Sequence, residues 1–85
     1  MQHARSDYDR IQDPAGLIPD GEPVFLIRGG DACGPAAVLY WAALASLREA
    51  DPAIIEAASN QARRMYEWQL EHGSKVPDMP EGAGK

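Results

Sequence analysis

Hydrophobic residues recur with helical spacing in the second half of the chain. The stripe follows intervals of three and four residues and consists of Ile55, Ala58, Ala62 and Met65. Asp51 is a good N-cap, Pro52 is tolerated in a first turn, and Gly73 suits the position just after a helix. This pattern predicts a helix over residues 52–72, whose small side chains let another helix approach closely.

Another helix is expected at about residues 32–50, where the hydrophobic pattern has no polar side. From Ala36 to Leu47 the only polar groups are Ser46 and the hydroxyl of Tyr40. A helix that is apolar all round is buried on more than one side. Because the junction between the two helices is short, we expect them to fold back on each other as an antiparallel hairpin.

The first half of the chain is rich in glycine and proline and is expected to form turns around one short strand. We predict this strand over residues 22–28, on the apolar run from Val24 to Ile27. One strand alone leaves its backbone groups unpaired, so it requires a partner. The partner is either a second short strand over residues 8–12 or the same strand from another subunit.

These elements predict an α+β fold that is mostly α, with the helical hairpin preceded by one or two short strands. A chain of 85 residues forms one small domain, which we place at residues 1–77, followed by a flexible tail over residues 78–85. A domain of this size buries only about 60% of its unfolded surface and needs further stabilisation.

Self-association is the expected source of that stabilisation. Cys33 is the only cysteine, so an internal disulfide is excluded, and its spacing to His3 and His72 does not fit a zinc site. The uniformly apolar helix also has too little of this chain to cover it. Both observations predict a homo-oligomer.

Charge and composition remove several classes of function. The chain has 8 Lys and Arg against 13 Asp and Glu, a net charge of −5, and no basic cluster. We therefore expect no binding to duplex nucleic acid, which requires clustered cations. No apolar run is long enough to span a membrane, and the N-terminus does not resemble a secretory signal, so a cytoplasmic location is expected.

The segment from Gly29 to Gly34 joins the predicted strand to the first helix. A glycine-rich loop at a helix start presents backbone amides that hold phosphate in many proteins. This loop lacks the lysine and hydroxyl residue of a P-loop, and Asp31 would repel an anion unless it faces away. The loop is either a capped turn or a small-anion site, in which Gly29 and Gly30 are candidate contacts.

Side chains of four residues are further candidates for ligand binding: Tyr8, Arg10, Arg28 and Trp41. Arg28 ends an apolar strand, where it either pairs with an aspartate, Asp9 or Asp31, or binds a ligand carboxylate or phosphate. Arg10 is expected to hold a phosphate with it. Tyr8 or Trp41 would stack on a base, although Trp41 also fits a core or subunit interface.

No set of residues has the pattern of a catalytic site. Cys33 lies near a helix start, but His3 and His72 lie toward opposite ends of the chain. Asp9 and Asp13 lack a third group, and a charged capping segment explains them better. We expect a protein that is not an enzyme and has neither a metal nor a cofactor.

Four segments together resemble small uncharacterised proteins encoded by bacteriophages and prophages. These segments are Tyr8 to Pro14, Glu22 to Asp31, Tyr40-Trp41-Ala42 and Met65 to Gln69. The resemblance covers residues 7–77 and assigns no role to any residue. It implies a context in which small phage proteins inhibit bacterial defence in the host cytoplasm, by binding a defence protein or by sequestering a cyclic nucleotide.

Two functional hypotheses follow. The first is a non-enzymatic homo-oligomer that binds and sequesters a small nucleotide at its subunit interfaces. The alternative is an inhibitor or accessory protein that binds a host or phage protein through an acidic or apolar surface.

Overall fold

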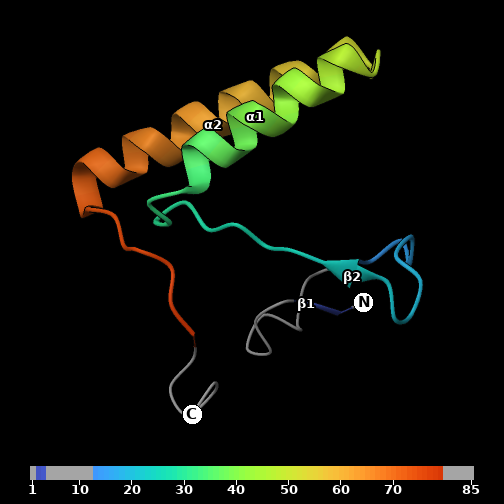
Figure 1. The fold of residues 1–85 in the computed structure, drawn as a ribbon, viewed down its shortest axis with the longest axis horizontal. Helices are drawn as coiled ribbons and strands as arrows, with labels where there is room; N and C mark the ends of the chain where they lie inside the picture. The colour runs from blue at the N-terminus through green and yellow to red at the C-terminus, as the bar shows by residue number, and fades with distance from the viewer. Residues whose placement is uncertain (1, 4–12, 80–85) are drawn as a thin grey trace. The chain divides into compact units, whose positions relative to one another are not determined.

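The computed structural model describes residues 2, 3 and 13–79, which form two short strands and two helices (Figure 1). The described chain divides into two compact units, one of Met1–Leu26 with Asp78–Lys85 and the other of Ile27–Pro77. The prediction of one domain over residues 1–77 stays a prediction.

The first unit contains a two-stranded parallel ribbon. Strand β1, Gln2–His3, pairs with strand β2, Pro23–Val24, so that Gln2 faces Pro23 and His3 faces Val24. The strand predicted over residues 22–28 is therefore much shorter. Its partner is neither of the two that were considered, and residues 8–12 lie outside the described part of the chain.

The connection before β2 is a series of turns fixed by one carboxylate. Asp13 accepts hydrogen bonds from the backbone amides of Leu17 and Ile18, at 3.1 and 3.0 Å. Its carbonyl oxygen also accepts the amide of Gly16, which adopts a left-handed backbone conformation with a φ of 62°. The aspartate thus acts as a local turn-former, as expected for a charged capping segment.

The second unit is the predicted helical hairpin, in which helix α1, Gly34–Leu47, packs along helix α2, Pro52–His72 (Figure 1). The bounds of α2 match the prediction. The Asp51 carboxylate caps it by accepting the amide of Ala53 at 2.9 Å. At the other end, Gly73 has a φ of 83° and leaves the helix.

Helix α1 is shorter than predicted at both ends. It begins at Gly34, because the carboxylate of Asp31 binds the amide of Cys33 in the preceding turn at 2.7 Å. It ends at Leu47, because Glu49 adopts a φ of 59°. The amides of Glu49 and Ala50 then bond back to the carbonyls of Ser46 and Ala45, which closes the helix as a Schellman motif.

The core of the hairpin is small. Among the described residues, the buried hydrophobic side chains are Ala42, Ala62 and Met65. Alanine from each helix at the contact lets the backbones approach closely, as the predicted stripe on α2 required, and Ile55 and Ala58 are partly buried beside them. The apolar side of α1 that faces away from α2 is exposed in the single chain.

Neither helix in the described part of the chain combines the length and apolar character needed to cross a membrane.

Candidate functional site

The loop from Arg28 to Cys33 is fastened to the C-terminal part of α2 by one side chain. The Nε2 atom of Gln69 donates hydrogen bonds to the carbonyl oxygens of Gly29 and Asp31, at 2.9 and 2.8 Å. Both carbonyls therefore point toward α2. A loop held in this way at two points loses less conformational entropy when it binds a ligand.

The segment after α2 returns to the same loop. The amide of Lys75 donates to the carbonyl of Gly30 at 2.8 Å, and the amide of Ala32 donates to the carbonyl of Lys75 at 2.9 Å. These two bonds form an isolated parallel bridge between Asp31 and Lys75. The loop is thus held by α2 on one side and by the chain that follows α2 on another.

Most amides of the loop are already used within the chain. The amide of Asp31 donates to the carbonyl of Arg28, and that of Gly34 donates to the carbonyl of Asp31. The amides of Ala32 and Cys33 bond to Lys75 and to the Asp31 carboxylate, as described above. This arrangement has the features of the capped turn, and an anion would depend on side chains more than on these four amides.

Two glycines let the loop lie close to α2. A side chain at Gly30 would come within 3.1 Å of the Trp68 ring, and one at Gly34 within 2.7 Å of the Met65 methyl group. Gly29 has more room, with its nearest neighbour, Met65, at 3.9 Å. Gly34 is therefore required for close packing, whereas a side chain at Gly30 would require the Trp68 ring to move by a few tenths of an ångström.

An aromatic pair lies beside the loop. Trp68 stacks on His72, with ring centroids 4.3 Å apart, and the His72 Nδ1 atom lies 3.1 Å from the Trp68 carbonyl oxygen. Trp68 is 46% exposed while its ring lies against Gly30. A half-exposed indole next to a fixed loop offers a flat surface on which a ring can stack.

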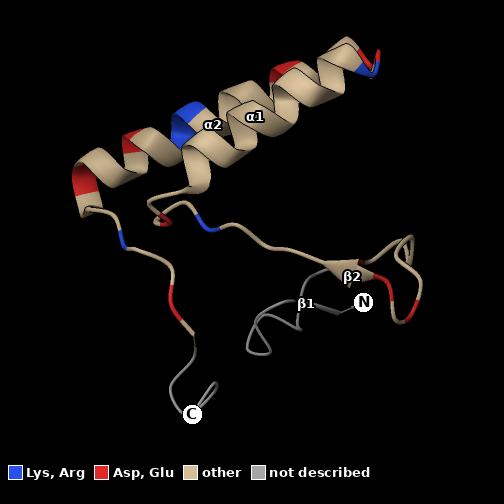
Figure 2. Ribbon diagram, in the orientation of Figure 1, with Lys and Arg blue, Asp and Glu red and all other residues tan. Residues whose placement is uncertain are grey.

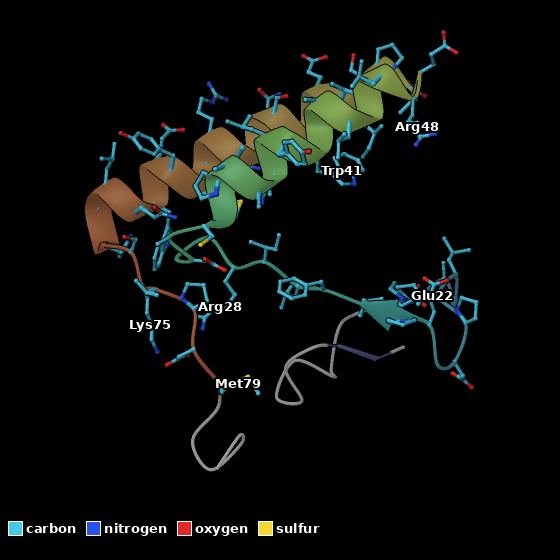
Figure 3. The ribbon with its side chains drawn as sticks, in the orientation of Figure 1. Glu22, Arg28, Trp41, Arg48, Lys75 and Met79 are labelled. Carbon is cyan, nitrogen blue, oxygen red and sulfur yellow. The ribbon has the colours of Figure 1, made fainter. Side chains whose placement is uncertain are left out.

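Arg28 lies at the start of this loop with its side chain exposed (Figure 3). Within residues 13–79 it forms no ion pair. The pairing with Asp31 that the sequence allowed is not present, since that carboxylate binds the Cys33 amide. The other suggested partner, Asp9, lies outside the described residues.

The remaining predicted site residues are not gathered around Arg28. Trp41 lies on α1, well beyond the loop (Figure 3), and is about half exposed. Tyr8 and Arg10 lie outside the described part of the chain. The described structure therefore brings together Arg28, Gly29 and Gly30 but does not place Trp41 beside them.

Helix α2 contributes residues to this site that were not among the predicted site residues. Trp68, Gln69 and His72 continue the stripe that ends at Met65, at the same intervals of three and four residues. Extending that stripe by one and two turns would have placed all three on the face that meets the first half of the hairpin. The signal was present, but a glutamine is usually interpreted as a surface residue.

The described residues contain no cluster of histidine, cysteine or acidic side chains that could hold a metal ion. Cys33 is an exposed free thiol next to α1.

Removing the Gln69 side chain is expected to loosen the loop. We predict that Gln69→Ala lowers the free energy of unfolding by about 1 kcal/mol, because two partly buried carbonyls lose their donor. Hydrogen exchange of the Ala32 amide should accelerate in the same variant. Gln61→Ala, an exposed glutamine on the same helix, is the matched control. Equal behaviour of the two variants would contradict a fastening role for Gln69.

Comparison with known proteins gives no relative from which a function can be transferred. No family model, no curated protein and no solved structure matches the chain.

Proposed function

We propose that this chain is a non-enzymatic binding protein that works as a homo-oligomer and sequesters a small nucleotide, as a phage-type counter-defence protein would. The observation that carries the proposal is Arg28, a cation without an ionic partner among the described residues, attached to a loop fixed by Gln69 and Lys75. A guanidinium binds phosphate through two parallel hydrogen bonds. Because the loop backbone is already held, little of that binding energy is lost in ordering it.

Two further features support a nucleotide as the ligand. The exposed part of Trp68 lies beside the same loop and suits stacking on a base. The apolar side of α1 supports an oligomer, in which residues of a second subunit would complete the site. Tyr8, Arg10 and Trp41 are the proposed residues of this chain that contribute from outside the loop.

Replacement of Arg28 tests the ligand assignment. We expect Arg28→Ala to weaken binding of the tightest ligand in a panel of linear and cyclic nucleotides at least tenfold, measured by calorimetry, because a charge-assisted bond contributes about 1.5–3 kcal/mol. Arg64→Ala, an exposed arginine on α2, is the control and should bind normally. Unchanged affinity in Arg28→Ala, or a native protein that binds none of the panel, would refute the assignment.

A second candidate is an inhibitor or accessory protein that binds a host or phage protein. It is favoured by the acidic balance of the chain and by the exposed glutamates of α2, Glu56, Glu67 and Glu71. Of these three, Glu67 alone forms an ion pair within the described residues, with its Oε1 atom 3.8 Å from Arg63 Nε. Co-purification of one protein at fixed stoichiometry, together with failure to bind any nucleotide, would favour this candidate over the first.

A further inference from the structure

The side of α1 that faces away from α2 carries large hydrophobic side chains exposed to solvent. They are Tyr40, Leu44 and Leu47, with Leu39 at the edge of this side. Tyr40 is 69% exposed and Leu47 is 80% exposed. Single exposed hydrophobic residues are ordinary on protein surfaces, but a group of this kind along one helix marks an interaction surface.

This surface contains no charge. Helix α1 has no Asp, Glu, Lys or Arg from Gly34 to Leu47, and Figure 2 shows it without the blue and red segments found on α2 and at the turn between the helices. Two copies of a chain with a net charge of −5 repel each other through most surfaces. The uncharged side of α1 is where two copies meet without opposing like charges.

Small and large residues alternate along the middle of this side. Ala36, Tyr40, Ala43 and Leu47 are all exposed and follow at intervals of four, three and four residues. That spacing forms one straight stripe on a helix, as at the contact positions of a coiled coil. The order small, large, small, large is complementary to itself when a second helix runs in the opposite direction.

We propose that a second copy of this chain docks on α1, with the two α1 helices antiparallel about a two-fold axis. In this register Tyr40 lies opposite Ala43 of the partner subunit, and Leu47 lies opposite Ala36 of the partner subunit. Each pair of facing residues then contains one large and one small side chain, so the side chains fill the interface without steric overlap. The product is a four-helix arrangement made of two hairpins, with an isologous interface.

The large side chains of this side supply about half of the area that such a dimer needs. Tyr40, Leu44 and Leu47, with Leu39 at the edge, present roughly 100 Å² apiece and therefore about 400 Å² per copy. A stable interface buries about 800 Å² per partner. The alanines of the stripe and the backbone between them supply further contact area, since a facing helix approaches closely at small residues.

This inference rests on the homo-oligomer of the proposed function but not on its ligand. A dimer formed through α1 that binds no nucleotide would leave the docking surface in place and refute the ligand. A monomer that binds nucleotide through Arg28 would refute the docking surface and leave the ligand assignment in place. The docking surface on α1 and the nucleotide ligand are therefore tested independently.

The oligomeric state of the full chain tests the surface. Sedimentation velocity over a series of protein concentrations should show a monomer–dimer equilibrium. Leu47→Lys should weaken dimerisation at least tenfold, because it buries a charge at the interface. The folded monomer should be unaffected, since Leu47 is exposed in the single chain. Leu70→Lys is the matched control: it makes the same charge change in the last turn of α2 at a residue that is 70% exposed, and it should dimerise normally.

Disulfide trapping tests the register. In a Cys33→Ser background, a chain with Ala36→Cys is mixed with a chain with Leu47→Cys and allowed to oxidise. The antiparallel register predicts the mixed disulfide between residues 36 and 47 as the main product. Disulfides between two copies of the Ala36→Cys chain as the main product would overturn the register. A protein that is monomeric at every concentration, or equal weakening by Leu47→Lys and Leu70→Lys, would overturn the proposal.

Discussion

Replacing Met65 by alanine is expected to lower the free energy of unfolding by about 2–4 kcal/mol, the largest effect of any single truncation in the hairpin. Met65 is the only large side chain among the buried hydrophobic residues of the described chain, where it is 6% exposed. The other two, Ala42 and Ala62, have only a methyl group to remove. Truncation at Met65 thus removes the one large buried side chain of the described residues, which lies between α2 and the loop.

The Met65→Ala substitution should also affect the loop that carries Arg28. Met65 also lies against Gly29 and Gly34, so its side chain fills the space between α2 and the segment that carries Arg28. Without it, that segment loses part of its packing on α2 and depends more on Trp68 and on the hydrogen bonds of Gln69. We expect the Met65→Ala protein to have both a lower stability and faster hydrogen exchange in the loop.

Urea denaturation at one fixed protein concentration measures this effect. Leu70→Ala is the control, because it removes an exposed hydrophobic side chain from the same helix. Its free energy of unfolding should remain within about 0.5 kcal/mol of that of the native protein. If Met65→Ala and Leu70→Ala unfold at the same midpoint, the hairpin does not depend on the core described above.

The sequence predicted α2 to the residue because all its signals are local. The Asp51-Pro52 start, the Gly73 end and the stripe through Ala62 and Met65 are encoded within the helix itself. Helix α1 lacked such signals at its C-terminal end. It stops at Leu47 because Glu49 adopts a left-handed backbone conformation. Glutamate seldom adopts this conformation, so the sequence pattern did not predict it.

The strand was overpredicted because an apolar run does not by itself specify what covers it. The run from Val24 to Ile27 has the composition of a strand, yet Phe25 is 70% exposed and strand β2 extends only over Pro23–Val24. Their partner, β1, forms a parallel pairing over two residues, which leaves no periodicity to detect. Short parallel pairings between distant segments depend on tertiary contacts, which a single sequence does not display.

The sequence predicted only part of the candidate site, because its other contacts also depend on tertiary structure. Arg28 and the glycines stood out because a cation after an apolar run and a glycine-rich turn are unusual in any sequence. Gln69 and the bridge between Asp31 and Lys75 did not, because their bonds join segments far apart along the chain. These contacts decide that the loop is a fixed turn, and they are visible only once the hairpin has brought its ends together.

Replacing Gly34 by alanine tests whether this position needs glycine because a side chain would clash with its neighbours. We expect Gly34→Ala to lower the free energy of unfolding by about 1–3 kcal/mol, as overpacking does. The new Cβ atom would lie 2.7 Å from the Met65 methyl group, 3.1 Å from the carbonyl oxygen of Arg28 and 3.2 Å from the side chain of Ile27. The Met65 methyl is at the end of a flexible side chain, but that side chain is buried and the Arg28 oxygen belongs to the backbone.

The same substitution at Gly29 provides the control and is expected to have the opposite sign. An alanine side chain there would meet Met65 at 3.9 Å, which is an ordinary van der Waals contact. Replacing glycine by alanine at an unstrained position restricts the unfolded chain and stabilises a protein by about 0.4–1 kcal/mol. Alanine brings this entropic gain at both glycines, so the difference between them isolates the steric cost at Gly34. Urea denaturation of both variants at equal concentration measures that difference, and two equally stable variants would show that the loop does not pack against α2 as closely as described.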